Sequence, residues 1–237
     1  DGKANARPHI KTLRETAATV QLDGDGALGY RPMMQATDMA VAKARETGIG
    51  MGAVCHIGHY GSAGHYVRRA MEQGCTAFSV QGAYPQYYLS NKGKSSAYYG
   101  NPPLCFGLPS ANQPPLVLDG ATCILADNQY GKEYDALQQL IPAALFKSMG
   151  YTGVATALGG VFVGQAGSSA QEIARKWPSA RMGGLVIAFP IDVFAPAAEF
   201  REGIDQMVEL VKEEMEPLQG YNEATLPGTL EHRCEQE

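Results

Sequence analysis

The 237-residue sequence lacks the features that mark several large classes of protein. No apolar run approaches the roughly 18 residues that a membrane-spanning helix needs, and no signal peptide is visible. The net charge is −5, so the basic surface of a sequence-independent nucleic-acid binder is missing. We therefore expect neither a membrane nor a nucleic acid among its partners.

Paired cysteines are absent as well. The five cysteines are scattered, odd in number and without any C-x-x-C pair, which argues against a zinc or disulfide framework and favours a reducing cytoplasm. No phosphate loop of the GxGxxG type occurs. Because no internal repeat or low-complexity linker interrupts the chain, we expect one domain over residues 1–237.

Apolar periodicity predicts alternating helices and strands, and hence a layered α/β fold. Glycine closes two of the predicted helices. The helices are predicted over residues 32–46, 63–74 and 198–215, with a further one inside 135–164. The strands are predicted over residues 19–22, 49–57, 75–85, 104–108, 116–118 and 182–194.

Two of these helices have informative faces. Small residues in the helix predicted inside 135–164 would let another backbone approach closely, which favours burial of this helix within the subunit or between subunits. They are Ala155, Ala157, Gly159 and Gly160. The helix over 198–215 is amphipathic, and we expect its apolar side to face the core. That side carries Phe200, Ile204, Met207, Val208 and Val211.

The segment CHIGHYGSAGHY, residues 55–66, holds three of the five histidines. Gly58 and Gly61 indicate a turn between a strand and a helix, where free backbone N–H groups point outward and ligands gather. A zinc site is disfavoured because no further ligand follows at a metal-binding spacing. A calcium loop at Asp23 fails too, because its twelfth position is Met34. An acid/base histidine and a hydrogen-bonded structural histidine both remain open.

Six blocks in order along the chain resemble the malate/L-lactate dehydrogenase family, which is unrelated to the classical Rossmann-type lactate dehydrogenases. The first blocks are LDGDGALGY and GHYGSAGHY, the second of which resembles the family's NHFG and AGxY signatures and places its histidine at His59. GNPPLCFGLPS and PPLVLDGATC follow, and then come FKSMGYTGVATALGGVFVG and TLPGT.

The resemblance implies a mixed-sheet α/β fold that is not a Rossmann fold, and a dimer or higher oligomer. It also implies hydride transfer between NAD or NADP and a small 2-keto or 2-hydroxy acid, or a cyclic imino acid. It assigns the catalytic acid/base to His59 and no residue to a metal. The cofactor-binding positions that it implies are Asp119, Ala121, Thr122, Cys123, Lys147, Ser148, Pro227, Gly228 and Thr229.

Several positions depart from the family pattern. The family's proton-donor histidine lies in an N-terminal helical segment, and it has no counterpart here because the sequence begins at Asp1, which aligns just after it. Pro102, Cys123, Ser148 and Thr229 replace an Asn, a Ser, a Gly and a Glu. The segment between Asp119 and Pro142 is also shorter than in the family.

Two classes of function follow from these matches and departures. The first is an NAD(P)-dependent dehydrogenase. The alternative is a non-redox enzyme, or a subunit of reduced activity, that uses His59 as acid/base on a small carboxylate substrate. In either case we expect another chain, either a second copy in a homo-oligomer or a different polypeptide, to complete the active-site pocket.

Overall fold

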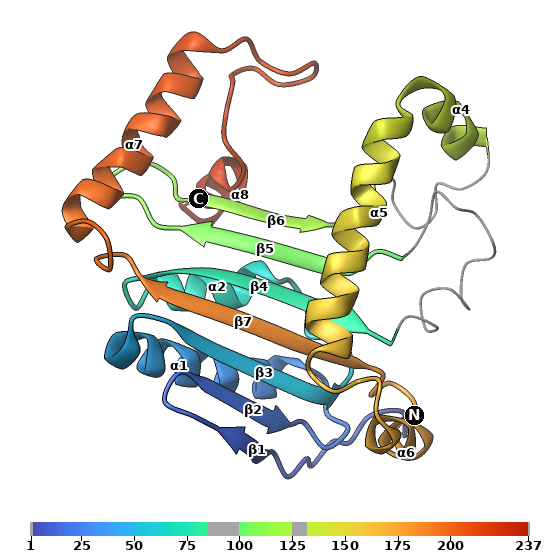
Figure 1. Cartoon of the computed structure of the whole chain (residues 1–237). Helices are drawn as coiled ribbons and strands as arrows, with labels where there is room; N and C mark the ends of the chain where they lie inside the picture. The colour runs from blue at the N-terminus through green and yellow to red at the C-terminus, as the bar shows by residue number, and fades with distance from the viewer. Residues whose placement is uncertain (1, 85–99, 125–131, 237) are drawn as a thin grey trace.

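The computed structural model describes residues 2–84, 100–124 and 132–236, and its described strands form one seven-stranded mixed sheet (Figure 1). The strand order is β1-β2-β3-β7-β4-β5-β6, with both parallel and antiparallel neighbours. The prediction of a mixed-sheet α/β fold is thereby confirmed. The strands are β1 (Lys11–Glu15), β2 (Thr19–Asp23), β3 (Gly50–Ile57), β4 (Cys75–Ala83), β5 (Pro103–Leu108), β6 (Leu116–Ala121) and β7 (Met182–Pro190).

The helices lie on both faces of the sheet and beyond its edge (Figure 1). They are α1 (Tyr30–Thr47), α2 (Gly64–Met71), α4 (Lys132–Leu140), α5 (Pro142–Thr156), α6 (Ser168–Lys176), α7 (Ala197–Glu214) and α8 (Thr229–Gln236). A π-helical turn, η1 (Ala157–Val161), continues α5. No helix among these described segments is both long enough and apolar enough to cross a membrane.

Four strands run in one direction and end at the same edge of the sheet. β2 and β3 are parallel, while β7 is antiparallel to both β3 and β4, so β3 and β4 point the same way. β5 and β6 reverse direction twice more, so β6 is parallel to β4. In Figure 1 these four arrowheads lie on the right. We call this side the carboxyl edge, because it gathers the C-terminal ends of β2, β3, β4 and β6.

Glycines set the spacing between layers on both faces. Helices α1 and α2 cover one face, where a Cβ at Gly52 of β3 would lie 2.3 Å from the carbonyl oxygen of Ala36. On the other face, η1 rests on β4 and β7. There a Cβ at Gly160 would lie 2.4 Å from the carbonyl oxygen of Ala83. The close approach predicted for the small residues of this segment is thus found within the subunit.

The predicted elements are found with shifted ends. The helix predicted to close at Gly74 ends at Met71, and the last core strand ends at Pro190 rather than at residue 194. The strand predicted over 75–85 ends at Ala83, and Pro85 lies outside the described residues. β1, α4, α6 and α8 were not predicted. All five β1 residues are exposed, so the strand carries no inward-facing apolar signal.

The face predicted for α7 is only partly correct. Ile204 and Val208 are buried, but Met207 is 47% exposed. The buried position beside Ile204 belongs instead to Asp205, at 8% exposure. Its carboxylate accepts backbone hydrogen bonds from the turn between β5 and β6, which compensates for the loss of water.

Candidate active site

His59 is exposed in the loop that follows β3, at the carboxyl edge of the sheet. Beneath it lies Gln81 of β4, which is 1% exposed. The Nδ1 atom of His59 lies 3.0 Å from Oε1 of Gln81. A buried side chain on a central strand therefore fixes the orientation of an exposed imidazole.

The hydrogen bonds of Gln81 also determine the tautomer of His59. The Nε2 group of Gln81 donates to the carbonyl of Gly58 at 3.1 Å, so Oε1 must face His59 and the amide of Tyr60. Because Oε1 is only an acceptor, Nδ1 of His59 carries the proton. The N–H of Gly61 also points at this Nδ1, at 3.3 Å, and we regard that contact as the weaker one because Nδ1–H cannot accept. The Nε2 atom of a neutral His59 is then left with a lone pair.

Two buried tyrosines pack against each other and hold the loop that carries His59. Tyr60 and Tyr66 are fully buried, with ring centroids 4.8 Å apart. The hydroxyl of Tyr66 donates to the carbonyl of Tyr60. Burial raises the pKa of the Tyr66 hydroxyl well above its usual range, so it stays a donor at neutral pH. The loop is therefore held rigidly on the α2 side of the sheet.

Asp119, a predicted cofactor residue on β6, lies against the start of α2. Its carboxylate accepts hydrogen bonds from the hydroxyl of Ser62 and from the backbone N–H of Gly64, the latter at 2.9 Å. A carboxylate at this position stabilises the helix by accepting from an otherwise unpaired N–H and by opposing the helix dipole. Asp119 thus connects β6 to the loop that carries His59.

The end of β6 and the helix α5 bring three further predicted residues together. Ser148 donates to the carbonyl of Thr122 at 2.6 Å, and the hydroxyl of Thr152 donates to that of Thr122 at 2.8 Å. The N–H of Cys123 donates to the side-chain oxygen of Asn101 at 2.8 Å. Ala121, the last residue of β6, is exposed. These polar groups are satisfied by one another, so they hold α5 against the strand end.

Pro227, Gly228 and Thr229 run along the outer side of β6. The N–H of Val117 donates to the carbonyl of Pro227 at 3.0 Å. Gly228 has φ +97°, and a Cβ there would lie 2.8 Å from the backbone N of Val117. Thr229 is buried and begins α8. Asp119, Pro227 and Gly228 line a hollow of about 430 Å³ whose opposite wall is formed by the end of α7.

Lys147 lies on the opposite face of the sheet. It lines a hollow of about 650 Å³ between α5 and the strands β4, β5 and β7. The other walls are apolar and include Phe78, Phe106 and Tyr151. Lys147 makes no ion pair with the residues that the structure describes. An unpaired ammonium group at the rim of an aromatic hollow is suited to an anionic ligand that carries a flat ring.

Most of the predicted cofactor residues therefore lie on or beside one strand, β6, but the set does not share one cavity. Asp119, Pro227 and Gly228 line the smaller hollow, whereas Lys147 lines the larger one. Phe106 pairs with Leu118 and faces α5, while Gly107 pairs with Val117 and faces α2, so the sheet separates the two hollows. His59 lines neither of them, and its assignment as the acid/base stays a prediction.

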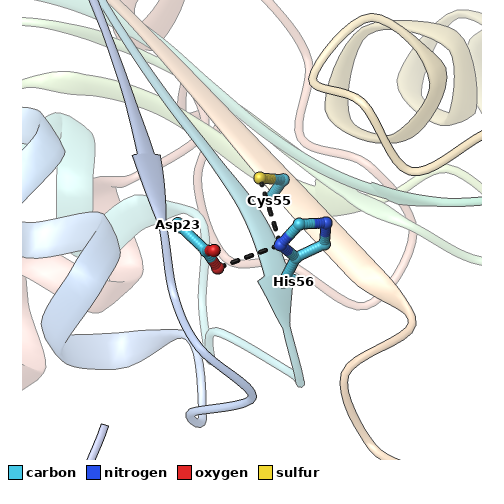
Figure 2. Close-up of side chains that lie close together, drawn as sticks. All are labelled: Asp23, Cys55 and His56. Carbon is cyan, nitrogen blue, oxygen red and sulfur yellow. Dashed lines mark hydrogen bonds and ion pairs between the residues drawn. The ribbon is translucent and has the colours of Figure 1, made fainter. Parts of the chain in front are cut away.

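Sequence reasoning missed a second polar cluster at the carboxyl edge. Asp23 ends β2, and Cys55 and His56 lie near the end of β3 (Figure 2). The Nδ1 atom of His56 lies 2.9 Å from Oδ1 of Asp23 and 3.6 Å from Sγ of Cys55. Burial lowers the pKa of His56, but the hydrogen bonds to Asp23 and Cys55 and the charge of Asp23 outweigh it and raise this pKa to about 10. No partner for His56 was predicted from the sequence.

Comparison with known proteins agrees with this arrangement. Residues 1–136 match the family model described as malate/L-lactate dehydrogenase. L-sulfolactate dehydrogenase from Methanocaldococcus jannaschii is 27% identical over 98% of this chain and 73% of its own length. Malate dehydrogenase from Pyrococcus abyssi is 35% identical over 52% of this chain and 33% of its own. The crystal structure of malate dehydrogenase from Entamoeba histolytica superposes with a TM-score of 0.78 at 21% identity, covering 99% of this chain and 75% of that one.

The match over residues 1–136, more than half of the sequence, places this chain in the malate/L-lactate dehydrogenase family. It is an enzyme of the dehydrogenase class, as its named relatives are. The family resemblance inferred from the six sequence blocks is confirmed. The alternative of a non-redox enzyme finds no support among these relatives.

Proposed function

We propose that the protein transfers a hydride between NAD or NADP and a small 2-hydroxy or 2-keto acid, with His59 as the acid/base. The observation that carries this proposal is the placement of His59. Its ring is exposed at the carboxyl edge, and a buried side chain 3.0 Å from Nδ1 holds it in place. Relatives named for L-sulfolactate and malate support a hydroxy acid rather than a cyclic imino acid as substrate.

In this proposal His59 moves one proton at Nε2. When a hydroxy acid is oxidised, Nε2 accepts the proton of its hydroxyl group, and a bound nicotinamide would supply the acceptor for the hydride from the carbon that carries this hydroxyl. In the reverse reaction the imidazole of His59 returns that proton from Nε2 to the developing alkoxide. Gln81 keeps Nδ1 protonated throughout and so directs the lone pair of Nε2 outward.

The larger hollow fits the part of a nicotinamide dinucleotide that lies away from its reactive ring, because His59 at the carboxyl edge does not line this hollow. Aromatic and aliphatic walls suit a flat ring, and the ammonium group of Lys147, which makes no ion pair with any described residue, suits a phosphate. Thr122 and Ser148 have their hydroxyl groups engaged with neighbouring residues, so we propose that they shape the wall. Asp119, Ala121, Cys123, Pro227, Gly228 and Thr229 are proposed to contribute from the strand end and the adjoining segment.

We further propose that the protein works as a homo-oligomer in the cytoplasm. Three apolar side chains of α5 project into solvent around the larger hollow, namely Phe146 at 76%, Tyr151 at 59% and Val154 at 55% exposure. A second copy of the chain would cover them and narrow the hollow. The cysteines are scattered along the sequence without any C-x-x-C pair, which favours a reducing compartment.

Titration with NADH and NADPH, followed by nucleotide fluorescence, tests the cofactor proposal. We expect saturable binding, and we expect Lys147→Gln to weaken it about tenfold, because it removes one charge–phosphate contact. Lys11→Gln, a change of the same type on the far edge strand β1, should leave the affinity unchanged. No binding of either nucleotide at millimolar concentration would contradict the proposal.

A further inference from the structure

Three side chains of metal-binding type converge where β2 and β3 end (Figure 2). Each of Asp23, Cys55 and His56 offers one ligand atom, and these oxygen, sulfur and nitrogen atoms all lie within 4.8 Å of one another. Cys55 and His56 are 2% and 5% exposed, whereas the side chain of Asp23 is 23% exposed. Cys55 and His56 therefore shield the cluster from solvent, whereas an ion can reach it from the side of Asp23.

A distortion of β3 is what brings Cys55 and His56 together. Neighbouring residues of a regular strand point to opposite faces, so they do not share a ligand. Here the register with β7 shifts between Val54 and Ile57, and His56 adopts φ +57°. As a result, the Cys55 sulfur and the His56 Nδ1 atom lie 3.6 Å apart beside β2.

This left-handed conformation is unfavourable for a histidine and persists only where the surroundings enforce it. Among the described non-glycine residues, only Asp25 also has a positive φ, at +48°. One of the two strained residues thus belongs to the cluster, and the other lies two residues from Asp23. Strain concentrated at one place is typical of a functional position rather than of an ordinary strand end.

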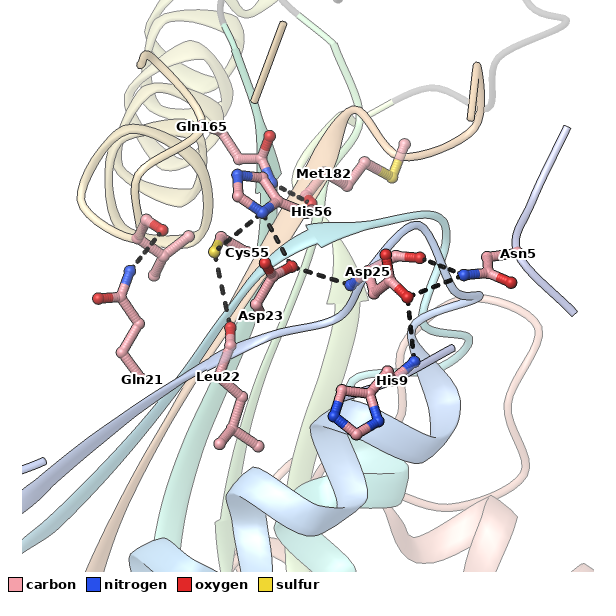
Figure 3. Close-up of polar contacts among 11 residues, drawn as sticks. Asn5, His9, Gln21, Leu22, Asp23, Asp25, Cys55, His56, Gln165 and Met182 are labelled. Carbon is pink, nitrogen blue, oxygen red and sulfur yellow. Dashed lines mark hydrogen bonds and ion pairs between the residues drawn. The ribbon is translucent and has the colours of Figure 1, made fainter. Parts of the chain in front are cut away.

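The turn after β2 orients the Asp23 carboxylate from outside (Figure 3). The N–H of Asp25 donates to Oδ1 of Asp23 at 2.9 Å. Asp25 is held in turn by the N-terminal segment, because its Oδ2 accepts from the N–H of His9 and from the amide of Asn5, both at 3.0 Å. Such outer hydrogen bonds are what fix the first ligands of metal sites.

We propose that Asp23 Oδ1, Cys55 Sγ and His56 Nδ1 bind Zn²⁺, with water as the fourth ligand. Zinc bonds of roughly 2.0–2.3 Å place tetrahedral ligand atoms about 3.4–3.7 Å apart. The Sγ–Nδ1 distance of 3.6 Å already fits, and the Asp23–His56 pair at 2.9 Å must open slightly. When the ion binds, the proton held between His56 and Asp23 and the thiol proton of Cys55 both leave to solvent, so His56 binds through a neutral imidazole and Cys55 as a thiolate.

The donor set selects the type of ion. A thiolate and an imidazole favour Zn²⁺ over Mg²⁺ and Ca²⁺, which take oxygen ligands. The spacing along the sequence predicted no metal, because Asp23 lies on another strand, 32 residues before Cys55 in the chain. Only the parallel pairing of Asp23 with Cys55 across β2 and β3 reveals the site.

Cobalt substitution of the full-length protein tests the proposal directly. We expect Co²⁺ to bind one to one with a thiolate-to-cobalt charge-transfer band, and Zn²⁺ to displace it. At free Zn²⁺ about 100 times Kd, Tm should rise by about 5–10 °C. Cys55→Ser should abolish the band, and His56→Asn or Asp23→Asn should weaken Zn²⁺ binding at least 100-fold. Cys75→Ser, the same change at a buried cysteine of β4, should leave both readouts unchanged.

The proposal is overturned if wild-type protein binds no stoichiometric Co²⁺, or binds it without the thiolate band. The wild-type spectrum decides this even if a variant does not fold. Equal binding by wild type and Cys55→Ser would also overturn it and leave Asp23–His56 as a structural ion pair. Because none of these measurements involves a nucleotide, their outcome is independent of the dehydrogenase proposal.

Discussion

Three histidines within ten residues occupy three different environments. His56 is buried and paired with Asp23, whereas His59 is exposed and held at Nδ1 by Gln81. His65 lies on the exposed side of α2, with its ring 5.5 Å from that of Tyr66 in an edge-on arrangement. Only His59 combines solvent access with a fixed orientation. At the scale of the residue, this combination is what qualifies a histidine for proton transfer.

His59→Asn should lower turnover by roughly 10²–10⁴, because the proton would then have no acceptor at the carboxyl edge. The variant should bind NADH as the wild type does, since His59 lines neither hollow. Steady-state kinetics with 2-hydroxy acids measure the effect. His65→Asn provides the matched control and should retain activity, and full activity of His59→Asn would show that the assignment is wrong.

The sequence correctly placed His59 in a turn between a strand and a helix, because Gly58 and Gly61 flank it, whereas its role was implied only by the family resemblance and stays a prediction. It was insufficient for Gln81, which is read from sequence as one more residue of a buried strand. It also missed the cluster at Asp23, because neither strand pairing nor the bulge at His56 is visible in the spacing of residues. Contacts between distant segments were the part that required the structure.

At the scale of the element, η1 depends on backbone-to-backbone packing. Gly159 and Gly160 lie so close to Gly82 and Ala83 of β4 that no side chain fits between them. The π-helical turn widens the end of α5 at this contact. The segment that carries Lys147 and Ser148 is thus anchored at one end by glycine contacts and at the other by the hydrogen bonds to Thr122.

Gly159→Ala should destabilise the protein by about 1–3 kcal/mol, because its Cβ would lie 2.4 Å from the backbone N of Gly82. Gly153→Ala is the matched control on α5, where a Cβ meets nothing within 4 Å. That change should stabilise by about 0.5–1 kcal/mol, since alanine loses less conformational entropy in a helix. Urea unfolding measures both, and equal effects of the two changes would refute the packing argument.

Asp205 is the corresponding anchor for α7. Its carboxylate accepts from the backbone N–H groups of Ala111, Asn112 and Gln113 at 3.0, 2.9 and 3.1 Å. Burial alone would raise the pKa of Asp205, but these backbone hydrogen bonds outweigh it and lower the pKa below its usual value. A single charged side chain thereby holds the helix against the turn between β5 and β6.

Asp205→Asn should lower the free energy of unfolding at neutral pH by about 2–4 kcal/mol, because an amide offers one weaker acceptor to three donors. Since the folded pKa of Asp205 is depressed, its contribution is complete above the unfolded value of about 3.9 and declines as pH falls through the folded pKa. The gap between wild type and variant should therefore shrink below about pH 4. Urea unfolding from pH 3 to 7 measures it, and a constant gap would exclude the charge as the cause.

At the scale of the whole molecule, the two faces of the sheet are covered unequally. α1 and α2 pack closely over one face, whereas around α5 the other face leaves Phe106 and Leu118 nearly half exposed. Light scattering after size-exclusion chromatography should show an assembly of the 25.3 kDa chain at micromolar concentration. Phe146→Glu, on the exposed side of α5, should shift it towards the monomer, and Leu218→Glu, equally exposed beyond α7, should not. A fully active monomer would contradict the proposal.

The central position of β7 has a consequence for how the chain acquires its structure. Residues 182–190 lie between β3 and β4, so they join one group of strands, β1 to β3, to another, β4 to β6. During translation, both groups of strands are synthesised well before β7, the strand that pairs with both. The first 136 residues, although they carry the family match, should therefore remain two separate, aggregation-prone half-sheets until β7 emerges from the ribosome. Folding of this enzyme is then a late event that begins only when its last quarter is synthesised, and chaperones would be needed most before that point.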